Sequence, residues 1–131
     1  MKKLSMRILV VDDEESVRRS LRAYLEDEGF EVIEAENGEK ALEVLGKNRV
    51  AAAIVDIRLP GMDGNDFIER AHQMDSNLGF LVFTGSVNYQ LPERLLRLGV
   101  GEAQMFVKPL GDVAPLTTAL KTILQMREDH E

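Results

Sequence analysis

The sequence contains no cysteine and no tryptophan, and aromatic residues make up only 5% of its 131 residues. Without cysteine the chain can form neither disulfides nor zinc–thiolate sites and has no thiol nucleophile, which makes a reducing compartment the expected environment. Long hydrophobic runs are also missing, because stretches such as "ILVV" and "FLVF" fall far short of the ~18 residues that a membrane span needs. We therefore expect a cytoplasmic protein that does not enter a membrane.

Positive charge is in the minority, because 16 Lys and Arg residues stand against 23 Asp and Glu residues, for a formal net charge of −7. Proteins that bind nucleic acid contact its phosphates through a surplus of Lys and Arg on one face, so direct nucleic-acid binding is not expected. The apolar fraction of 44% and the charged fraction of 30% are typical of a globular domain. We predict a single domain over residues 1–131, with a core at about 6–126 and a polar C-terminal tail.

Short apolar runs alternate with longer amphipathic stretches along the chain. The runs resemble buried parallel strands, which are apolar on both faces, and the stretches repeat their apolar residues at helical spacing. Strands are predicted at 7–12, 30–35, 51–56, 80–85 and 104–109, and helices at 16–29, 37–48, 65–74, 88–99 and 112–127. This alternation predicts an α/β fold in which a parallel sheet carries helices on both faces.

Chemically active side chains follow four of the predicted strands. Asp12 and Asp13 end the first strand, Asp56 the third, Thr84 the fourth and Lys108 the fifth. Ligands of an open parallel sheet bind at the carboxyl ends of its strands, so these residues are expected to meet at one edge.

Carboxylates at neighbouring strand ends repel one another, since a pair ~4 Å apart costs on the order of 4 kcal/mol at an effective dielectric of 20. A protonated carboxyl, the lysine or a bound cation could compensate that repulsion. Because no His or Cys is nearby, the oxygen ligands favour magnesium or calcium, and magnesium commonly shares its shell with a substrate phosphate. Lys108 would then meet the phosphate as a point charge, Thr84 would donate a hydrogen bond to it, and a carboxylate could act as nucleophile to give an aspartyl phosphate.

Each of these residues also has an ordinary structural interpretation. Acids after a strand often cap the next helix, and a lone Asp such as Asp56 commonly forms a turn. Thr84 has the β-propensity of a strand residue, and Lys108 could be a surface lysine. None of these interpretations requires the residues to lie at the same end of their strands, and that coincidence favours a site.

Four blocks of the chain resemble the receiver domain of bacterial two-component response regulators. They are "ILVVDDEESVRRSL", "IVDIRLPGMDG", "FTGS" and "FVKPL", in the family's order and at about its spacing. Each block alone is a weak signal, whereas the set is specific and extends over essentially the whole chain. The resemblance implies a flavodoxin-like, doubly wound fold with a five-stranded parallel sheet of order 2-1-3-4-5.

The resemblance implies that Asp56 is the phosphoacceptor and that magnesium is the cofactor. Asp13 and Asp56 would bind the metal through their carboxylates, Arg58 would bind it through its backbone carbonyl, and Asp12 would act mostly through a bound water. The donor of the phosphoryl group would be a phosphohistidine on a sensor histidine kinase or a phosphotransfer protein.

The resemblance further implies that the Thr84 hydroxyl moves to the phosphoryl group and that Lys108 pairs with it. The bond between Lys108 and Pro109 resembles a cis peptide of the family, and X-Pro bonds are the ones for which the cis form is inexpensive. The signal would pass to the face formed by helix 4, strand 5 and helix 5. The same face could also serve for a homodimer.

Two features depart from the family pattern. Three residues before the lysine, where the family usually has Tyr or Phe as a switch, the sequence has Met105, followed by Phe106. Either Phe106 enters the core while Met105 is a flexible substitute for the aromatic residue, or the strand is bulged. The segment "RLGVGEAQMFVKP" is also longer than the usual connection between helix 4 and strand 5, so the output face departs further from the family than the phosphorylation site does.

The leading hypothesis is a phosphoacceptor module, free-standing or part of a larger regulator. It would catalyse its own phosphorylation and dephosphorylation and would not otherwise be an enzyme. The first alternative is a magnesium-dependent phosphatase or phosphotransferase with an aspartyl nucleophile, although such enzymes normally need a cap or a further acid or base. The second is a receiver-like binding module that is never phosphorylated, against which the complete set of site residues argues.

Overall fold

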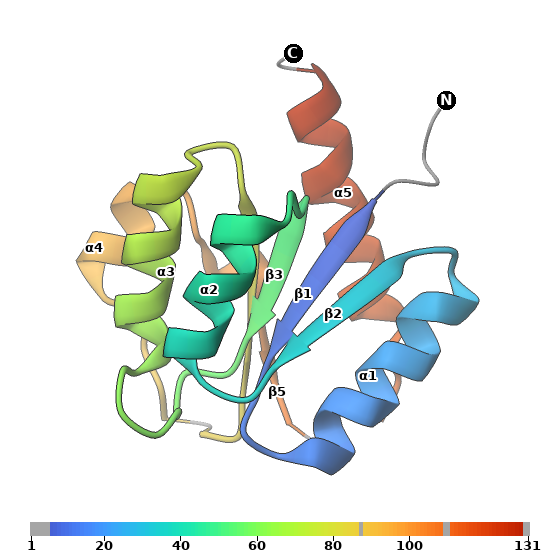
Figure 1. Ribbon diagram of the computed structural model, residues 1–131, viewed down its shortest axis with the longest axis horizontal. Helices are drawn as coiled ribbons and strands as arrows, with labels where there is room; N and C mark the ends of the chain where they lie inside the picture. The colour runs from blue at the N-terminus through green and yellow to red at the C-terminus, as the bar shows by residue number, and fades with distance from the viewer. Residues whose placement is uncertain (1–5, 87, 109–110, 130–131) are drawn as a thin grey trace.

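The computed structural model of the chain describes residues 6–86, 88–108 and 111–129, which form a five-stranded parallel sheet between two layers of helices (Figure 1). The sheet has the strand order β2-β1-β3-β4-β5. The strands are β1 (Arg7–Val11), β2 (Glu31–Ala35), β3 (Ala52–Val55), β4 (Gly79–Thr84) and β5 (Met105–Val107). The predicted fold class and strand order are therefore confirmed.

Helices cover both faces of this sheet. They are α1 (Glu15–Asp27), α2 (Gly38–Lys47), α3 (Gly64–Met74), α4 (Glu93–Arg97) and α5 (Ala114–Asp129), and a short 3₁₀ helix, η2 (Glu102–Gln104), precedes β5. Figure 1 shows α2, α3 and α4 on one face and α1 and α5 on the other. None of the helices in the described residues combines the length and apolar character needed to cross a bilayer.

The central strand β3 explains why the sequence has a continuous apolar run there. Its alternate residues face opposite layers, so that Ala53 and Val55 join the core beneath α2 and α3, whereas Ala52 and Ile54 join the core beneath α1 and α5. Phe67 of α3 is the largest of the fully buried side chains. Each such side chain contributes about 1.5–3 kcal/mol of hydrophobic stabilisation.

The connection between β4 and β5 differs from the sequence prediction. The predicted helix over 88–99 is shorter, because α4 begins only after Pro92, whose ψ of 156° is extended. A residue that precedes proline is disfavoured in helical conformation, and Leu91 therefore lies outside the helix. The predicted start of the fifth strand at Gln104 is also wrong, since this residue belongs to η2.

Candidate functional site

The backbone brings the predicted site residues to one edge of the sheet. The N–H of Asp12 donates to the Ala35 carbonyl at 3.1 Å, and that of Asp56 donates to the Val11 carbonyl at 2.9 Å. These bonds continue the pairing of β1 with β2 and of β3 with β1 by one residue. The two acids therefore emerge side by side at the carboxyl ends of adjacent strands, as the sequence predicts.

The ammonium group of Lys108 lies between these two acids. Its Nζ atom is 2.8 Å from Oδ2 of Asp12, 3.0 Å from Oδ2 of Asp56 and 3.7 Å from Oε1 of Glu14. The carboxylate side chains of Asp12 and Asp56 are only 2% and 6% exposed. Because buried charges are unfavourable without a partner, Lys108 is the residue that makes this pair of carboxylates tolerable.

Asp13 completes a cluster of three carboxylates. One oxygen from each of Asp12, Asp13 and Asp56 lies within 4.8 Å of the others. Asp13 is exposed, and within the described residues its carboxylate has no hydrogen bond or ion pair. Three carboxylates thus form an all-oxygen cluster in which Lys108 pairs with only two of them, and such a donor set and charge suit a hard divalent cation such as magnesium.

Burial and pairing shift the pKa values of Asp12 and Lys108. Burial raises the pKa of Asp12 from its ordinary value of 3.8, although the hydrogen bonds from Lys108 and from the Glu14 backbone act in the opposite direction. Burial alone would lower the pKa of Lys108, but its hydrogen bonds to Asp12 and Asp56 outweigh that effect and raise it from 10.5. Lys108 is therefore protonated at neutral pH and supplies positive charge to both acids.

The loop after β3 holds the Asp56 carboxylate oxygen that is not bonded to Lys108. The backbone N–H of Arg58 donates to Oδ1 of Asp56 at 3.1 Å. The N–H of Gly64 donates to the Ile57 carbonyl at 2.8 Å and so closes the loop. Gly61 has a φ of +75°, which is the left-handed conformation that the Pro-Gly turn requires. A Cβ atom at Gly64 would lie 2.5 Å from the Asp56 carbonyl oxygen, so only glycine lets α3 begin this close to the acid.

Thr84 lies next to Lys108 without reaching the acids. It is fully buried at the end of β4, and its carbonyl accepts a hydrogen bond from the Lys108 backbone N–H at 2.8 Å. Its hydroxyl oxygen accepts from the N–H of Ser86 at 3.2 Å and has no hydrogen bond to Asp56. The Thr84 hydroxyl is therefore bonded to the backbone of the segment that follows β4 and not to the acids.

Met105 and Phe106 point to opposite faces of an unbulged strand. Consecutive β5 residues pair with consecutive β4 residues, Met105 with Val82 and Phe106 with Phe83. Met105 packs on the core beneath α2, α3 and α4, whereas Phe106 packs on the core beneath α1 and α5. Of the two alternatives that the sequence left open, the structure has the regular strand. The predicted cis bond between Lys108 and Pro109 lies outside the described residues.

The sequence matches the family model of the response regulator receiver domain over residues 8–121, which is more than half of the chain. The chain belongs to the response regulator receiver family. Among curated proteins, the sporulation initiation phosphotransferase F of Bacillus subtilis is 28% identical over 126 residues, which cover 96% of this chain and 99% of the relative. The transcriptional regulatory protein SrrA of Staphylococcus aureus is 49% identical over 61 residues. These residues make up 47% of this chain and 25% of SrrA.

Solved receiver structures share this fold. A CheY-like response regulator receiver domain from Methanospirillum hungatei is 28% identical and has a TM-score of 0.85. The match covers 97% of this chain and 99% of that structure's chain. The response regulator TrrA of Thermotoga maritima, solved in complex with Mg²⁺-BeF, is also 28% identical, with a TM-score of 0.77 and coverage of 90% and 98%.

Sequence reasoning missed two charged residues beside this receiver site. Nη1 of Arg18 in α1 donates to the backbone carbonyl of Asp12 at 2.8 Å, and Nε of the same side chain donates to Glu34 of β2 at 3.0 Å. Glu34 is the second of two acids in β2 and lies between Ile33 and the buried Ala35, and this is the signal that could have indicated a paired, partly buried charge. Nothing comparable in the sequence indicates that Arg18 bonds to the Asp12 carbonyl.

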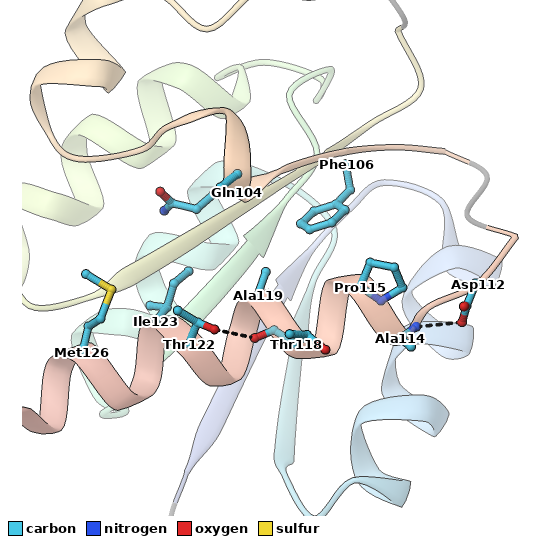
Figure 2. Close-up of a pocket in the computed structure, with 11 residues that line it drawn as sticks. Gln104, Phe106, Asp112, Ala114, Pro115, Thr118, Ala119, Thr122, Ile123 and Met126 are labelled. Atoms are coloured by element: carbon cyan, nitrogen blue, oxygen red, sulfur yellow. Dashed lines mark hydrogen bonds between the residues drawn. The ribbon is translucent and has the colours of Figure 1, made fainter.

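A groove lies away from the acid cluster, between α5 and the segment formed by η2 and β5 (Figure 2). Its volume is about 650 Å³, and apolar side chains that include Phe106, Ala119, Ile123 and Met126 line it. The groove therefore belongs to the strand 5 and helix 5 face that the sequence analysis names as the output surface.

Proposed function

We propose that this receiver domain accepts a phosphoryl group on Asp56 from a phosphohistidine of a sensor histidine kinase or phosphotransfer protein. The observation that carries the proposal is the environment of the Asp56 carboxylate. It is buried, it touches the ammonium group of Lys108 at 3.0 Å and the Arg58 N–H at 3.1 Å, and it lies beside Asp12 and Asp13. A carboxylate held at a fixed position by positive groups suits an in-line attack on phosphorus.

Asp12, Asp13, Asp56 and the carbonyl of Arg58 are the groups that would hold magnesium. The donor set fits this ion, and the solved complex of Thermotoga maritima TrrA with Mg²⁺-BeF supports the assignment. When bound, the ion supplies positive charge for the phosphoryl oxygens. Asp56 provides the attacking oxygen, and the bond between phosphorus and the histidine nitrogen breaks as the new oxygen–phosphorus bond forms.

Lys108 and Thr84 would stabilise the transferred group. The Lys108 ammonium is already at the Asp56 oxygen and can move to the phosphoryl oxygens, where charge accumulates in the transition state. The Thr84 hydroxyl accepts a hydrogen bond from Ser86, so its own proton is available to donate to the phosphoryl group. Water would later remove the group, and the domain would act as a phosphoacceptor that catalyses its own phosphorylation and dephosphorylation.

The movement of Thr84 would reach the output face through β5. Met105 packs on the same core layer as Val82 of the neighbouring strand, so it would adapt to a shifted Thr84 as a flexible side chain. We propose that the face of α4, β5 and α5, which includes the groove of Figure 2, is the output surface. Phosphorylation would change which partners bind there, and a second copy of the chain would be one of them. A cytoplasmic location stays a prediction.

Intact mass spectrometry after incubation with magnesium and acetyl phosphate tests this proposal. We expect one added phosphoryl group in the wild type and none in Asp56→Asn. Asp63→Asn is the matched control, because Asp63 caps α3 through the Asp66 N–H and Asn caps as well as Asp. Labelling in Asp56→Asn, or no labelling in folded wild type, would contradict the assignment, and turnover of many phosphoesters would favour an enzyme.

A further inference from the structure

Arg18 connects three segments of the chain next to the acid cluster. Its Nη1 atom donates to the Asp12 carbonyl at 2.8 Å, and its Nε atom donates to Oε1 of Glu34 at 3.0 Å. The Arg18 side chain is only 14% exposed and that of Glu34 is 25% exposed. One planar guanidinium group therefore joins α1, β2 and the segment that follows β1.

Asp12 is fixed at all of its polar groups. Its N–H donates to the Ala35 carbonyl, its Oδ1 accepts from the Glu14 N–H at 2.9 Å, and its Oδ2 pairs with Lys108 at 2.8 Å. Arg18 supplies the remaining contact, which is the one to the carbonyl oxygen. That carbonyl belongs to the planar peptide group that joins Asp12 to Asp13. Arg18 therefore fixes the orientation of this peptide group, and with it the start of the Asp13 backbone.

Asp13 depends on this backbone for its direction. Its carboxylate has no partner in the described part of the chain, yet one of its oxygens lies within 4.8 Å of oxygens of Asp12 and Asp56. We propose that Arg18 is a positioning residue for the magnesium site, because it fixes the peptide between the two acids and so aims Asp13 at the metal. This inference rests on the proposed function, in which these carboxylates bind magnesium.

The charge of Arg18 and its position act in opposite directions on metal binding. A positive guanidinium near the site repels a divalent cation, so a loss of charge alone would tighten magnesium binding. A loss of positioning would weaken it, because partners of metal ligands commonly contribute tenfold or more in affinity. The sign of the change in affinity therefore distinguishes the two roles.

The experiment is a calorimetric titration of the folded chain with magnesium alone, without any phosphodonor. We expect Arg18→Ala to raise the magnesium dissociation constant by about tenfold. Arg18→Lys keeps the charge, but its three donors are on one nitrogen at the end of a flexible chain, whereas Arg18 reaches Glu34 and the Asp12 carbonyl with two separate nitrogens of a rigid fork. This variant is therefore expected to bind magnesium several-fold more weakly than the wild type. It also carries the test if Arg18→Ala fails to fold.

Arg22→Ala is the matched control. Arg22 lies on the same helix and donates to the same Glu34 at 2.6 Å, but its hydrogen bonds go to Glu34 and Glu26 and not to Asp12. The variant loses the same charge and part of the same contact between α1 and β2. Its magnesium dissociation constant should stay within twofold of the wild type or fall, even where its thermal stability drops as far as that of Arg18→Ala.

Two results would overturn the inference. One is that Arg18→Ala binds magnesium as tightly as the wild type or more tightly, which would mean that Arg18 does not position the site. The other is that Arg22→Ala weakens binding as much as Arg18→Ala, which would mean that the anchoring of α1 is responsible. If the wild type itself does not bind magnesium, the proposed function fails and not this inference alone.

Discussion

Lys108 and Asp56 are 52 positions apart in the sequence, yet Nζ of the lysine lies 3.0 Å from Oδ2 of the aspartate. The contact forms because β3, β4 and β5 are neighbours in a parallel sheet, which brings their carboxyl ends to one edge. The same Nζ is 2.8 Å from Asp12. A single ammonium group thus compensates two buried carboxylates and is already at the oxygen that we propose as nucleophile.

Replacement of this lysine should affect both stability and chemistry. Lys108→Met leaves two buried carboxylates without their partner, so we expect the free energy of unfolding in EDTA to fall by about 3 kcal/mol. Magnesium should restore part of that loss. Phosphorylation by acetyl phosphate should slow by about 100-fold, since a group that stabilises charge in the transition state is gone. Urea unfolding and timed intact-mass measurements give the two values.

Lys121→Met is the control for that variant. Lys121 is 56% exposed and pairs with Glu28 on the surface, so its loss should change stability by at most about 0.5 kcal/mol and leave the labelling rate unchanged. Equal stability and equal rates for the two variants would show that the lysine between the acids has no special role.

Magnesium should stabilise the folded chain through Asp13. The ion binds the assembled carboxylates and not the unfolded chain, so at 100 times its dissociation constant it adds about 2.7 kcal/mol to the free energy of unfolding. Asp13→Asn should remove most of this gain, whereas Glu15→Gln, which changes an exposed acid paired with Arg19, should keep it. A melting temperature that is the same with magnesium and with EDTA would contradict the metal site.

Much of this site is predictable from sequence because of how parallel strands are buried. Strand β3 is apolar on both faces, so the first charge after it, Asp56, marks the point where the chain reaches the edge of the sheet. The same reasoning places Asp12 after β1 and Lys108 after β5. The order of strands is what makes these ends meet, and here the resemblance to receiver domains supplied what local patterns could not.

Other features depend on close packing or on backbone groups, which leave little trace in a sequence. The hydrogen bond from Arg18 to the Asp12 carbonyl is an example. Arginine is a common surface residue and every residue has a backbone carbonyl, so the sequence does not indicate this pair. The late start of α4 is visible only as Pro92, which is compatible with the first turn of a helix or with the residue before it. The short η2 helix forms where Gln104 bonds both to the Gly101 N–H and to the Phe80 carbonyl.

The pair of Glu34 with its two arginines should make stability depend on pH. Burial alone would raise the pKa of Glu34, but hydrogen bonds from Arg22 and Arg18 outweigh it and hold the pKa below the ordinary value of 4.5. An acid with a lowered pKa adds stability above its unfolded pKa and loses that contribution as the pH falls through the folded value. Glu34→Gln should therefore be less stable than the wild type at pH 7 and approach it towards pH 3.

Urea unfolding of both proteins in EDTA, at intervals between pH 7 and pH 3, measures this effect without a contribution from bound metal. The expected sign is a difference in free energy of unfolding that shrinks as the pH falls. A difference that is constant across this range, or that grows towards low pH, would show that the arginines do not lower the pKa of Glu34.

Gly64 should be intolerant of a side chain because of its contact with the backbone of Asp56. A Cβ atom there would lie 2.5 Å from the Asp56 carbonyl oxygen and 2.7 Å from Cα of Ile57, so the backbone below the phosphoacceptor must shift. We expect Gly64→Ala to lower the free energy of unfolding by roughly 1–3 kcal/mol, as overpacking does, and to slow phosphorylation. Gly46→Ala is the control, because a Cβ at this position within α2 meets nothing within 4 Å, and it should stabilise by roughly 0.5–1 kcal/mol. If Gly64→Ala were as stable as Gly46→Ala and were phosphorylated at the wild-type rate, the close approach of α3 would not be what fixes Asp56.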